Sequence, residues 1–229
     1  MFNLVIDPGH GGKDPGAVGN NLNEKDINLG VALLLKEKLS PYKEKINLKL
    51  TRETDKALEL SERTTISNNF KADLFISIHC NSSTNSSAQG VETYCYKLSN
   101  NKGANAIHSE IINSKAYTKN RGIKEASYYV LRNTNAHAVL IELAFISNSS
   151  DARILKEKQN DFAEAILKGI LNYFNIKYQE NNTKPLEPNV EPQKIYRVCV
   201  GSFGVLDNAN KLKSELINKG YKDAFIVEK

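Results

Sequence analysis

Short apolar runs alternate with segments of helical periodicity along the first three quarters of the chain. The apolar runs predict strands at residues 2–6, 46–50, 73–78, 91–96 and 138–145. The spacing of apolar positions predicts helices at residues 24–39, 58–70, 102–115 and 151–174. Because strands and helices alternate, we expect an α/β fold in which helices flank a mostly parallel mixed sheet. In such folds, functional side chains gather where loops leave the carboxyl ends of the strands.

The pattern changes at residues 179–193, which contain three of the six prolines and only two aliphatic residues. Such a segment lacks the apolar surface that would offset the entropy of ordering it, so we interpret it as a linker. It separates a large domain, residues 1–178, from a tail, residues 194–229. The tail alternates in the same way and predicts a small β-α-β module. Its strand, helix and second strand are expected at residues 196–200, 208–219 and 225–227.

The composition of the 229 residues is that of an ordinary globular protein, with 40% hydrophobic and 25% charged residues. The longest apolar stretches, residues 31–35 and 139–146, are far shorter than the roughly 20 residues of a bilayer span, so we expect no membrane insertion. The net charge of +5 comes without a basic stripe and interleaved aromatic residues, so we expect no nucleic-acid partner. The first residues show no signal-peptide pattern, so we expect synthesis in the cytoplasm.

Two histidines and two glutamates stand near the ends of predicted strands and at the start of the first helix. His10 lies in a glycine-rich loop after the first strand, and His79 follows the third strand. Glu142 interrupts an apolar run, where an unpaired charge is unfavourable, and Glu24 begins the first helix. Each has a plain structural interpretation: a solvated imidazole, a paired or protonated carboxyl group, or a glutamate favoured by the helix dipole. As a set they are typical of a catalytic zinc site with three ligands and a further carboxylate as general base.

Several short motifs follow one another in order along the large domain. Three of them are Asp-Pro-Gly-His-Gly-Gly at residues 7–12, Asn-Glu-Lys-Asp at residues 23–26, and Ala-Asp-Leu-Phe-Ile-Ser-Ile-His-Cys-Asn at residues 72–81. Others are Thr-Arg at residues 51–52, Gly-Val-Glu at 90–92, Arg-Gly-Ile-Lys at 121–124 and Val-Leu-Ile-Glu at 139–142. Over residues 2–175 the chain resembles the type 3 family of zinc-dependent N-acetylmuramoyl-L-alanine amidases, which cut bacterial peptidoglycan.

The resemblance implies that His10, Glu24 and His79 bind Zn²⁺ and that Glu142 is the catalytic carboxylate. The implied reaction is hydrolysis of the amide bond between the lactyl group of N-acetylmuramic acid and L-alanine. Glu142 would take a proton from water and deliver it to the departing amine. Two other functions stay open: a catalytically degenerate protein that binds peptidoglycan, and a zinc peptidase that acts within the stem peptide.

The resemblance also implies a substrate groove near the loop at residues 121–122, where we expect Asn81 and Arg121 to bind substrate. The chain departs from the family pattern at two positions in the strand of Glu142. His137 stands where proline is usual, and Ala144 stands where glycine is common. Either change could alter the packing beside Glu142, although no expected metal ligand or base is missing.

The tail carries ordered motifs of its own, at residues 196–203, 208–212 and 220–227. They are similar to the first half of a SPOR domain, a module that binds peptidoglycan. A complete SPOR domain has two β-α-β halves, so we expect two chains to pair their tails in a homodimer. The alternatives are an RNA-binding-like β-α-β piece or a packing appendage. The whole chain is thus predicted to be a phage endolysin or bacterial autolysin that acts on the cell wall after release from the cytoplasm.

Overall fold

The computed structural model describes residues 1–114, 116–117, 119–179, 200–221 and 224–226. The chain divides into two compact units, Met1–Gln179 and Glu180–Lys229, and each is described by itself. Of the expected linker at residues 179–193, only Gln179 lies among the described residues. The expected domain boundaries therefore stay predictions.

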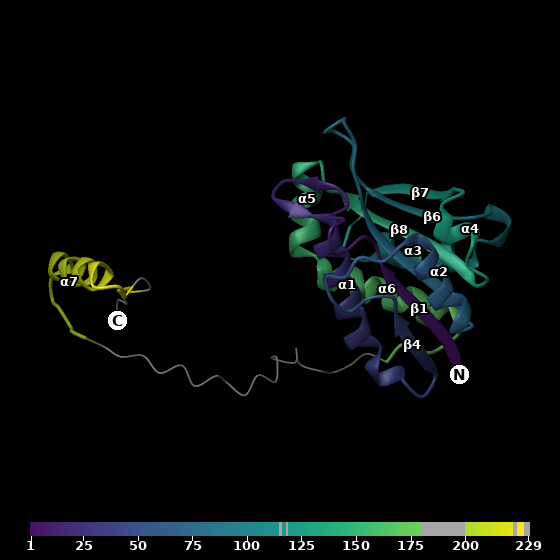
Figure 1. Ribbon diagram of the computed structural model, residues 1–229, viewed down its shortest axis with the longest axis horizontal. Coiled ribbons are helices and arrows are strands. Elements are labelled where there is room, and N and C mark those ends of the chain that lie inside the picture. The colour runs from purple at the N-terminus through teal and green to yellow at the C-terminus, as the bar shows by residue number, and fades with distance from the viewer. Residues whose placement is uncertain (115, 118, 180–199, 222–223, 227–229) are drawn as a thin grey trace. The chain divides into compact units, whose positions relative to one another are not determined.

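A six-stranded mixed sheet in the order β4-β1-β5-β8-β6-β7 forms the centre of the first unit (Figure 1). Its strands are β1 (Phe2–Pro8), β4 (Ile46–Leu50), β5 (Leu74–Asn81), β6 (Val91–Cys95), β7 (Asn120–Glu125) and β8 (His137–Phe145). Strands β4, β1, β5 and β8 are parallel, β6 is antiparallel to β8, and β7 is parallel to β6. The prediction of a mostly parallel mixed sheet is confirmed.

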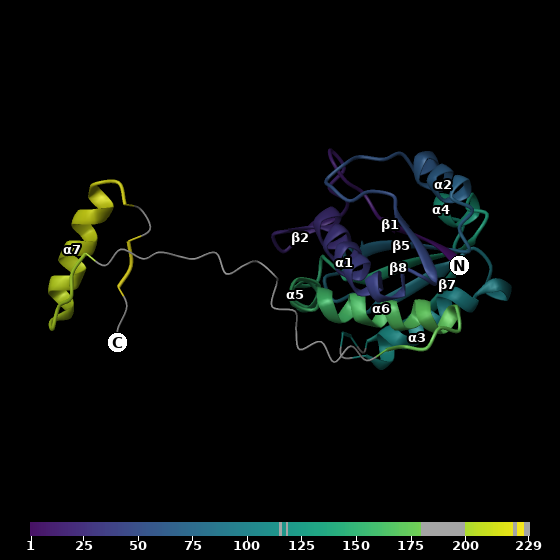
Figure 2. The ribbon, with the colours of Figure 1, turned by 90° about the horizontal axis from the view of Figure 1, so that it is seen from below.

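Helices flank both faces of this sheet (Figure 2). One face carries the helices α1 (Glu24–Leu39), α3 (Lys102–Asn113) and α6 (Gln159–Tyr173), and the other carries α2 (Leu60–Asn69) and α4 (Tyr129–Arg132). The remaining elements of this unit are the hairpin β2 (Val18–Gly19) and β3 (Leu22–Asn23), the 3₁₀ turns Ser40–Tyr42 and Leu98–Asn100, and α5 (Ser149–Glu157). No helix among the described residues is long and apolar enough to cross a membrane.

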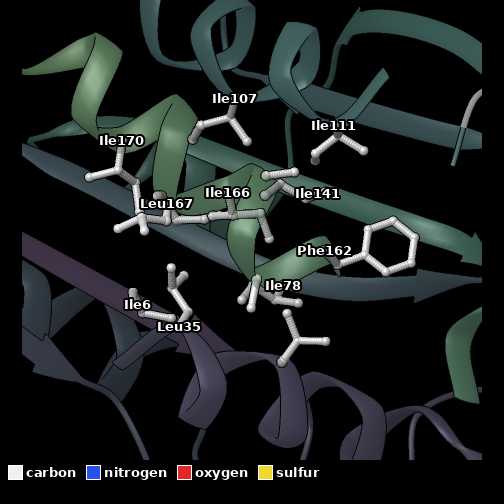
Figure 3. Close-up of a cluster of buried hydrophobic side chains, with 14 of the residues drawn as sticks. Ile6, Leu35, Ile78, Ile107, Ile111, Ile141, Phe162, Ile166, Leu167 and Ile170 are labelled. Carbon is white, nitrogen blue, oxygen red and sulfur yellow. The ribbon is translucent and has the colours of Figure 1, made fainter. Parts of the chain in front are cut away.

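The larger apolar core lies between the sheet and the face of α1, α3 and α6 (Figure 3). Ile6, Ile78 and Ile141 come from three adjacent strands and meet Leu35 of α1 and Ile166 of α6. Because side chains alternate along a strand, the intervening residues point to the opposite face. This opposite face of the sheet carries α2 and α4, and polar side chains can lie on it where these two helices do not cover it.

The first unit differs from the sequence prediction in the short elements β2, β3 and α4, which were not expected, and in one helix and one longer strand. The expected helix at residues 151–174 is two helices, because Lys158 leaves the helical region with φ −113° and ψ 19°. The four-residue repeat that supported one long helix, from Phe162 to Ile170, lies entirely in α6. Strand β7 was not predicted, because its sequence Asn-Arg-Gly-Ile-Lys-Glu is mostly polar and half-exposed at the sheet edge.

The described part of the second unit contains one helix, α7 (Leu206–Asn218), close to the expected residues 208–219. Residues 224–226 are not in a strand, contrary to the strand expected at residues 225–227. Of the other expected strand, residues 196–199 lie outside the described residues and Val200 is not in a strand.

Candidate metal centre and active site

The candidate site lies at the carboxyl ends of the adjacent parallel strands β1, β5 and β8. His10 follows β1, His79 lies near the end of β5, and Glu142 of β8 pairs directly with His79. Paired residues of neighbouring strands point to the same side of a sheet, so His79 and Glu142 share the face that α2 and α4 leave partly open. Glu24 reaches the same place as the first residue of α1. The structure thus brings all four predicted residues together at the carboxyl ends of these three strands.

The side chains of His10, Glu24 and His79 converge on one point. Nε2 of His10 lies 3.2 Å from Oε1 of Glu24, and Nδ1 of His79 lies 2.8 Å from the same oxygen. One ligand atom from each residue falls within 4.8 Å of the other two. Imidazole nitrogens and a carboxylate oxygen are donors that zinc prefers, so this group could hold a metal ion.

Hydrogen bonds from outside the group orient two of these side chains. Oδ2 of Asp14 lies 2.7 Å from Nδ1 of His10, which leaves Nε2 of that ring facing Glu24. The backbone amides of Ala17 and Cys80 donate to the two carboxylate oxygens of Glu24, at 2.8 and 3.0 Å. Contacts of this kind fix ligand orientation in metal sites.

The electrostatics of the group favour a positive charge beside Glu24. Burial works against its ionisation, yet hydrogen bonds and charges from His10 and His79 hold the pKa of Glu24 well below its usual range. Burial also disfavours the charged form of His10, but Glu24 and Asp14 raise the pKa of His10 to about 9. A divalent cation would supply the same positive charge in place of the His10 proton.

Two glycines make room for the converging side chains. A Cβ atom at Gly9 would lie 2.2 Å from Cε1 of His79. A Cβ atom at Gly16 would lie 2.6 Å from Oε2 of Glu24 and 2.7 Å from Cδ2 of His10. His10 itself has φ of +59°, in the left-handed region that is unfavourable for a residue with a side chain.

A buried ion pair holds the loop that carries His10. Nη1 of Arg63 donates to Oδ1 of Asp7 at 2.8 Å, and the hydroxyl groups of Thr51 and Ser77 donate to the same carboxylate. Nη2 of Arg63 donates to the backbone carbonyl of His10 at 2.9 Å. These bonds connect β1, α2 and the loop, and they offset the strain of the left-handed conformation.

Glu142 presents a carboxyl oxygen without a partner beside the cluster. Its Oε2 is buried, and no described residue forms a hydrogen bond with it. Burial raises the pKa of Glu142 to about 7; the charge of His79 opposes this shift, and the carboxylates of Glu24 and Glu92 add to it. A carboxyl group with a pKa near neutrality can accept a proton and return it.

Glu92 gathers the two residues that were expected to bind substrate, although the sequence pattern did not single it out. Its buried carboxylate accepts hydrogen bonds from Asn81 Nδ2 at 2.9 Å, Arg121 Nε at 2.5 Å, Lys124 Nζ at 2.7 Å and Tyr94 Oη at 2.5 Å. Burial alone would raise its pKa, but these donors hold the pKa of Glu92 at about 2. The sequence feature that could have identified Glu92 is an acidic residue inside the apolar run at residues 91–96. The same feature identified Glu142.

The two departures from the family pattern both lie on β8. His137 begins β8, where it pairs with Leu74 at the start of β5, and its Nδ1 lies 2.5 Å from Oη of Tyr173. That is the opposite end of β8 from Glu142. Ala144 is fully buried in the larger apolar core.

Comparison with known proteins identifies the family. The sequence profile of the N-acetylmuramoyl-L-alanine amidase family matches residues 4–172, and the chain belongs to this family, as its motifs predicted. It is 36% identical to a sporulation-specific N-acetylmuramoyl-L-alanine amidase of Bacillus subtilis, over 100% of the chain and 86% of that protein. It is 37% identical to an endolysin of Bacillus phage SPP1, over 100% of the chain and 89% of that protein.

Solved structures show the same architecture. The catalytic domain of CwlV, an N-acetylmuramoyl-L-alanine amidase from Bacillus (Paenibacillus) polymyxa var. colistinus, matches with a TM-score of 0.73 at 38% identity. That match covers 77% of this chain and 100% of that one. An N-acetylmuramoyl-L-alanine amidase from Clostridium difficile 630 matches with a TM-score of 0.71 at 37% identity, over 77% of this chain and 98% of that one. These matches confirm the predicted fold class.

Proposed function

We propose that this chain is a zinc-dependent peptidoglycan hydrolase that cleaves the amide bond between the lactyl group of N-acetylmuramic acid and L-alanine. The observation that carries the proposal is the convergence of His10, Glu24 and His79 beside the buried carboxyl group of Glu142. Membership in the amidase family and full-length similarity to a sporulation amidase and a phage endolysin support the same reaction.

The donor set fits a zinc ion. Two imidazole nitrogens and one carboxylate match catalytic zinc sites, which use three protein ligands and keep one position open. His10, Glu24 and His79 would hold the ion, and Asp14 would keep the ring of His10 oriented through Nδ1. When bound, the ion supplies Lewis-acid polarisation of water and of the amide carbonyl.

Glu142 is the proposed proton carrier. Its Oε2 has no hydrogen-bond partner among the described residues, so this oxygen is available to accept a proton from the attacking water. The apolar strand around it keeps the carboxyl group in place until the proton passes to the departing amine of L-alanine. Both steps require that the carboxyl group be able to gain and lose a proton near neutral pH, which its raised pKa provides.

Mass spectrometry of the products from purified peptidoglycan tests this reaction. The full chain should release stem peptides that begin at L-alanine and leave peptide-free glycan, and a zinc chelator should stop the release. Cleavage inside the stem peptide would instead identify a zinc peptidase. Intact peptidoglycan that retains the protein would identify a degenerate binding protein.

The substitution Glu142→Gln separates proton transfer from metal binding. We expect the variant to bind zinc like the wild type, because Glu142 is not one of the converging ligands. Its turnover should fall by about 10²–10⁴-fold, the usual contribution of a general acid–base group. Glu157→Gln is a matched control on an exposed helix position and should keep full activity. Near-wild-type turnover of Glu142→Gln would contradict the assignment.

We also propose that the tail binds peptidoglycan glycan and that the enzyme acts on the cell wall after release from the cytoplasm. The alignments with the sporulation amidase and the endolysin cover the whole chain, including the tail. None of the residues of α7 is buried, and large apolar side chains such as Phe203 and Tyr221 are exposed. These side chains are available to a glycan strand or to the tail of a second chain, so the expected homodimer stays a prediction.

A further inference from the structure

Arg121 presents a guanidinium group with two unused nitrogens near Glu142. Its Nε donates to Oε1 of Glu92 at 2.5 Å, and the group lies over the ring of Phe145 with 4.9 Å to the centroid. No described residue accepts a hydrogen bond from Nη1 or Nη2, and the side chain is 39% exposed. We call these two free nitrogens the Arg121 fork.

The backbone of β7 is shaped to place Arg121 there. The register between β6 and β7 shifts between residues 91 and 93, so that Arg121 and Gly122 both stand opposite Glu92. Gly122 takes a φ of +85° at this bulge. Bulges of this kind occur beside active sites, where they redirect a side chain. Gly90 leaves the space for it, since a Cβ atom there would lie 2.9 Å from Cγ of Arg121.

The surroundings of the Arg121 fork carry an excess of positive charge. Nζ of Lys124 donates to the same oxygen of Glu92 at 2.7 Å, and its side chain is 40% exposed. One buried carboxylate therefore holds two cations and can neutralise only one of them. A planar guanidinium that is fixed through Nε and by an aromatic ring suits a carboxylate, which accepts two parallel hydrogen bonds.

We propose that the Arg121 fork binds a free carboxylate on the second residue of the stem peptide, so that the enzyme prefers an ionised residue there over an amidated one. The inference rests on the proposed hydrolysis of the lactyl–alanine amide. A glutamate that is linked through its side-chain carboxyl group keeps its α-carboxylate free for this contact.

The reach of the substrate agrees with the position of the fork. An extended peptide advances about 3.3–3.6 Å per residue, so a carboxylate on the second residue lies ~7 Å from the scissile amide. Phe145, under the guanidinium, pairs with Asn81, which is two residues beyond the partner of Glu142 on β5, so Phe145 lies about 7 Å along the sheet from Glu142. Glu92, which holds Nε, pairs directly with Glu142. The fork therefore stands one to two peptide residues from the proton carrier.

Two synthetic muramoyl tripeptides test the proposal if they differ only in a carboxylate or a carboxamide on the second residue. With zinc-loaded full-length chain, we expect kcat/KM to be roughly ten- to hundredfold higher for the carboxylate, the range of one charge-assisted contact. Arg121→Gln should remove this preference by lowering kcat/KM much more for the carboxylate than for the carboxamide. Arg153→Gln is the control, because this arginine also pairs through Nε with a glutamate but lies on the exposed helix α5.

Each remaining outcome has one meaning. Equal kcat/KM of the wild type for both tripeptides would overturn carboxylate recognition and leave the hydrolytic function intact. An equal loss on both substrates in Arg121→Gln would show that Arg121 serves the local structure around Glu92, and it would also overturn the proposal. Absence of lactyl–alanine cleavage in the wild type would contradict the proposed function itself.

Discussion

At the scale of single residues, the chemistry of this site depends on how its carboxyl groups divide their roles. Glu24 is held ionised by the two histidines, Glu92 is held ionised by Lys124, Tyr94 and Arg121, and no described residue forms a hydrogen bond with Oε2 of Glu142. Of the three, only Glu142 therefore has a pKa raised toward neutrality. Groups whose surroundings drive their pKa values apart take different roles, which supports the proposal that Glu142 transfers the proton while Glu24 and Glu92 stay ionised.

The pKa of Glu142 makes the pH dependence of the reaction predictable. The carboxyl group must be ionised to accept a proton, so kcat/KM should fall about tenfold per pH unit below its pKa. Burial raises that pKa to about 7, and a zinc ion held by the neighbouring ligands would lower it, so the acidic limb should lie at or below about pH 7. Glu92→Gln removes a charge that raises the pKa of Glu142, and the limb should move to lower pH. A pH profile of kcat/KM on a soluble muramoyl peptide measures the acidic limb of the wild type and of the variant. A shift of this limb to higher pH in the variant would contradict this account.

Zinc binding should displace a proton from His10. The pKa of His10 is raised to about 9, because Glu24 and Asp14 outweigh the effect of burial, whereas a metal ligand must be a neutral imidazole. Zinc binding near pH 7 should therefore release about one proton, and the apparent affinity should increase with pH up to about 9. Calorimetric titration in buffers of different ionisation enthalpy counts the protons. Asp14→Asn should reduce the release at about pH 8, and an unchanged proton count would disprove the role of Asp14.

The raised pKa of His10 also makes the free energy of unfolding of the metal-free protein depend on pH. Its folded-state value lies above the ordinary value of 6.5, so the stabilisation from the His10 proton is complete below about pH 6.5. It is lost as the pH rises through about 9. Added zinc should remove this pH dependence, which unfolding midpoints in urea with and without chelator would reveal.

At the scale of structural elements, the end of β1 and its loop define where the two histidines meet. Gly9 lies against the ring of His79, and a Cβ atom there would lie 2.2 Å from Cε1 and 2.4 Å from Nε2. Gly9→Ala should therefore displace the ring and lower zinc affinity by about ten- to hundredfold, the usual effect of disturbing a ligand's support. Zinc content after dialysis measures this loss. Gly204→Ala is the control, because no atom lies within 4 Å of its Cβ position, and equal zinc retention in both variants would count against the close approach.

The elements also show what the sequence pattern could and could not predict. Strands β1, β5 and β8 are buried on both faces, so their sequences are continuous apolar runs. His10 and His79 were found at the ends of two such runs, and Glu142 was found as the charged residue inside the third. Strand β7 lies at the edge, and its half-exposed polar residues leave no periodic signal. The bulge that aims Arg121 depends on pairing with β6, which no local pattern reveals. The motif at residues 121–124 therefore indicated Arg121, while the hydrogen bonds that join Arg121 and Lys124 to Glu92 became visible only in the contacts between strands.

At the scale of the whole molecule, the chain combines a large catalytic unit with a small second unit that lacks a core in its described part. The first unit buries a continuous apolar cluster, whereas α7 buries none of its residues. A short segment without a core of its own is stabilised by what it binds. The alternation that predicted the first unit worked because tertiary burial reinforced it there. In the tail the same alternation predicted two strands, and residues 224–226 do not form one.

The second unit should therefore control attachment to the wall and leave hydrolysis unchanged. Phe203 and Tyr221 are 46% and 65% exposed. Replacing both with serine should weaken binding of the full chain to peptide-free glycan by about tenfold, because aromatic side chains bury a large apolar surface when they contact a ligand. The variant should keep its kcat/KM on a soluble muramoyl peptide, since the metal ligands and Glu142 all lie in the first unit. Tyr96→Ser removes a comparably exposed aromatic residue from the first unit and should change neither quantity.

The aromatic side chains of the tail could contact either a glycan strand or the tail of a second chain. Co-sedimentation with glycan and sedimentation velocity of the same proteins distinguish these two possibilities. If the tail binds glycan as a single copy, the double variant loses attachment while wild type and variant remain monomers. If two tails pair first, the wild type sediments as a dimer at concentrations where the variant is monomeric, and attachment falls with the loss of the dimer. Attachment that survives the double substitution would show that Phe203 and Tyr221 do not carry glycan binding. The exposed cations Arg121 and Lys124 of the first unit would then be the next side chains to replace in the same assay.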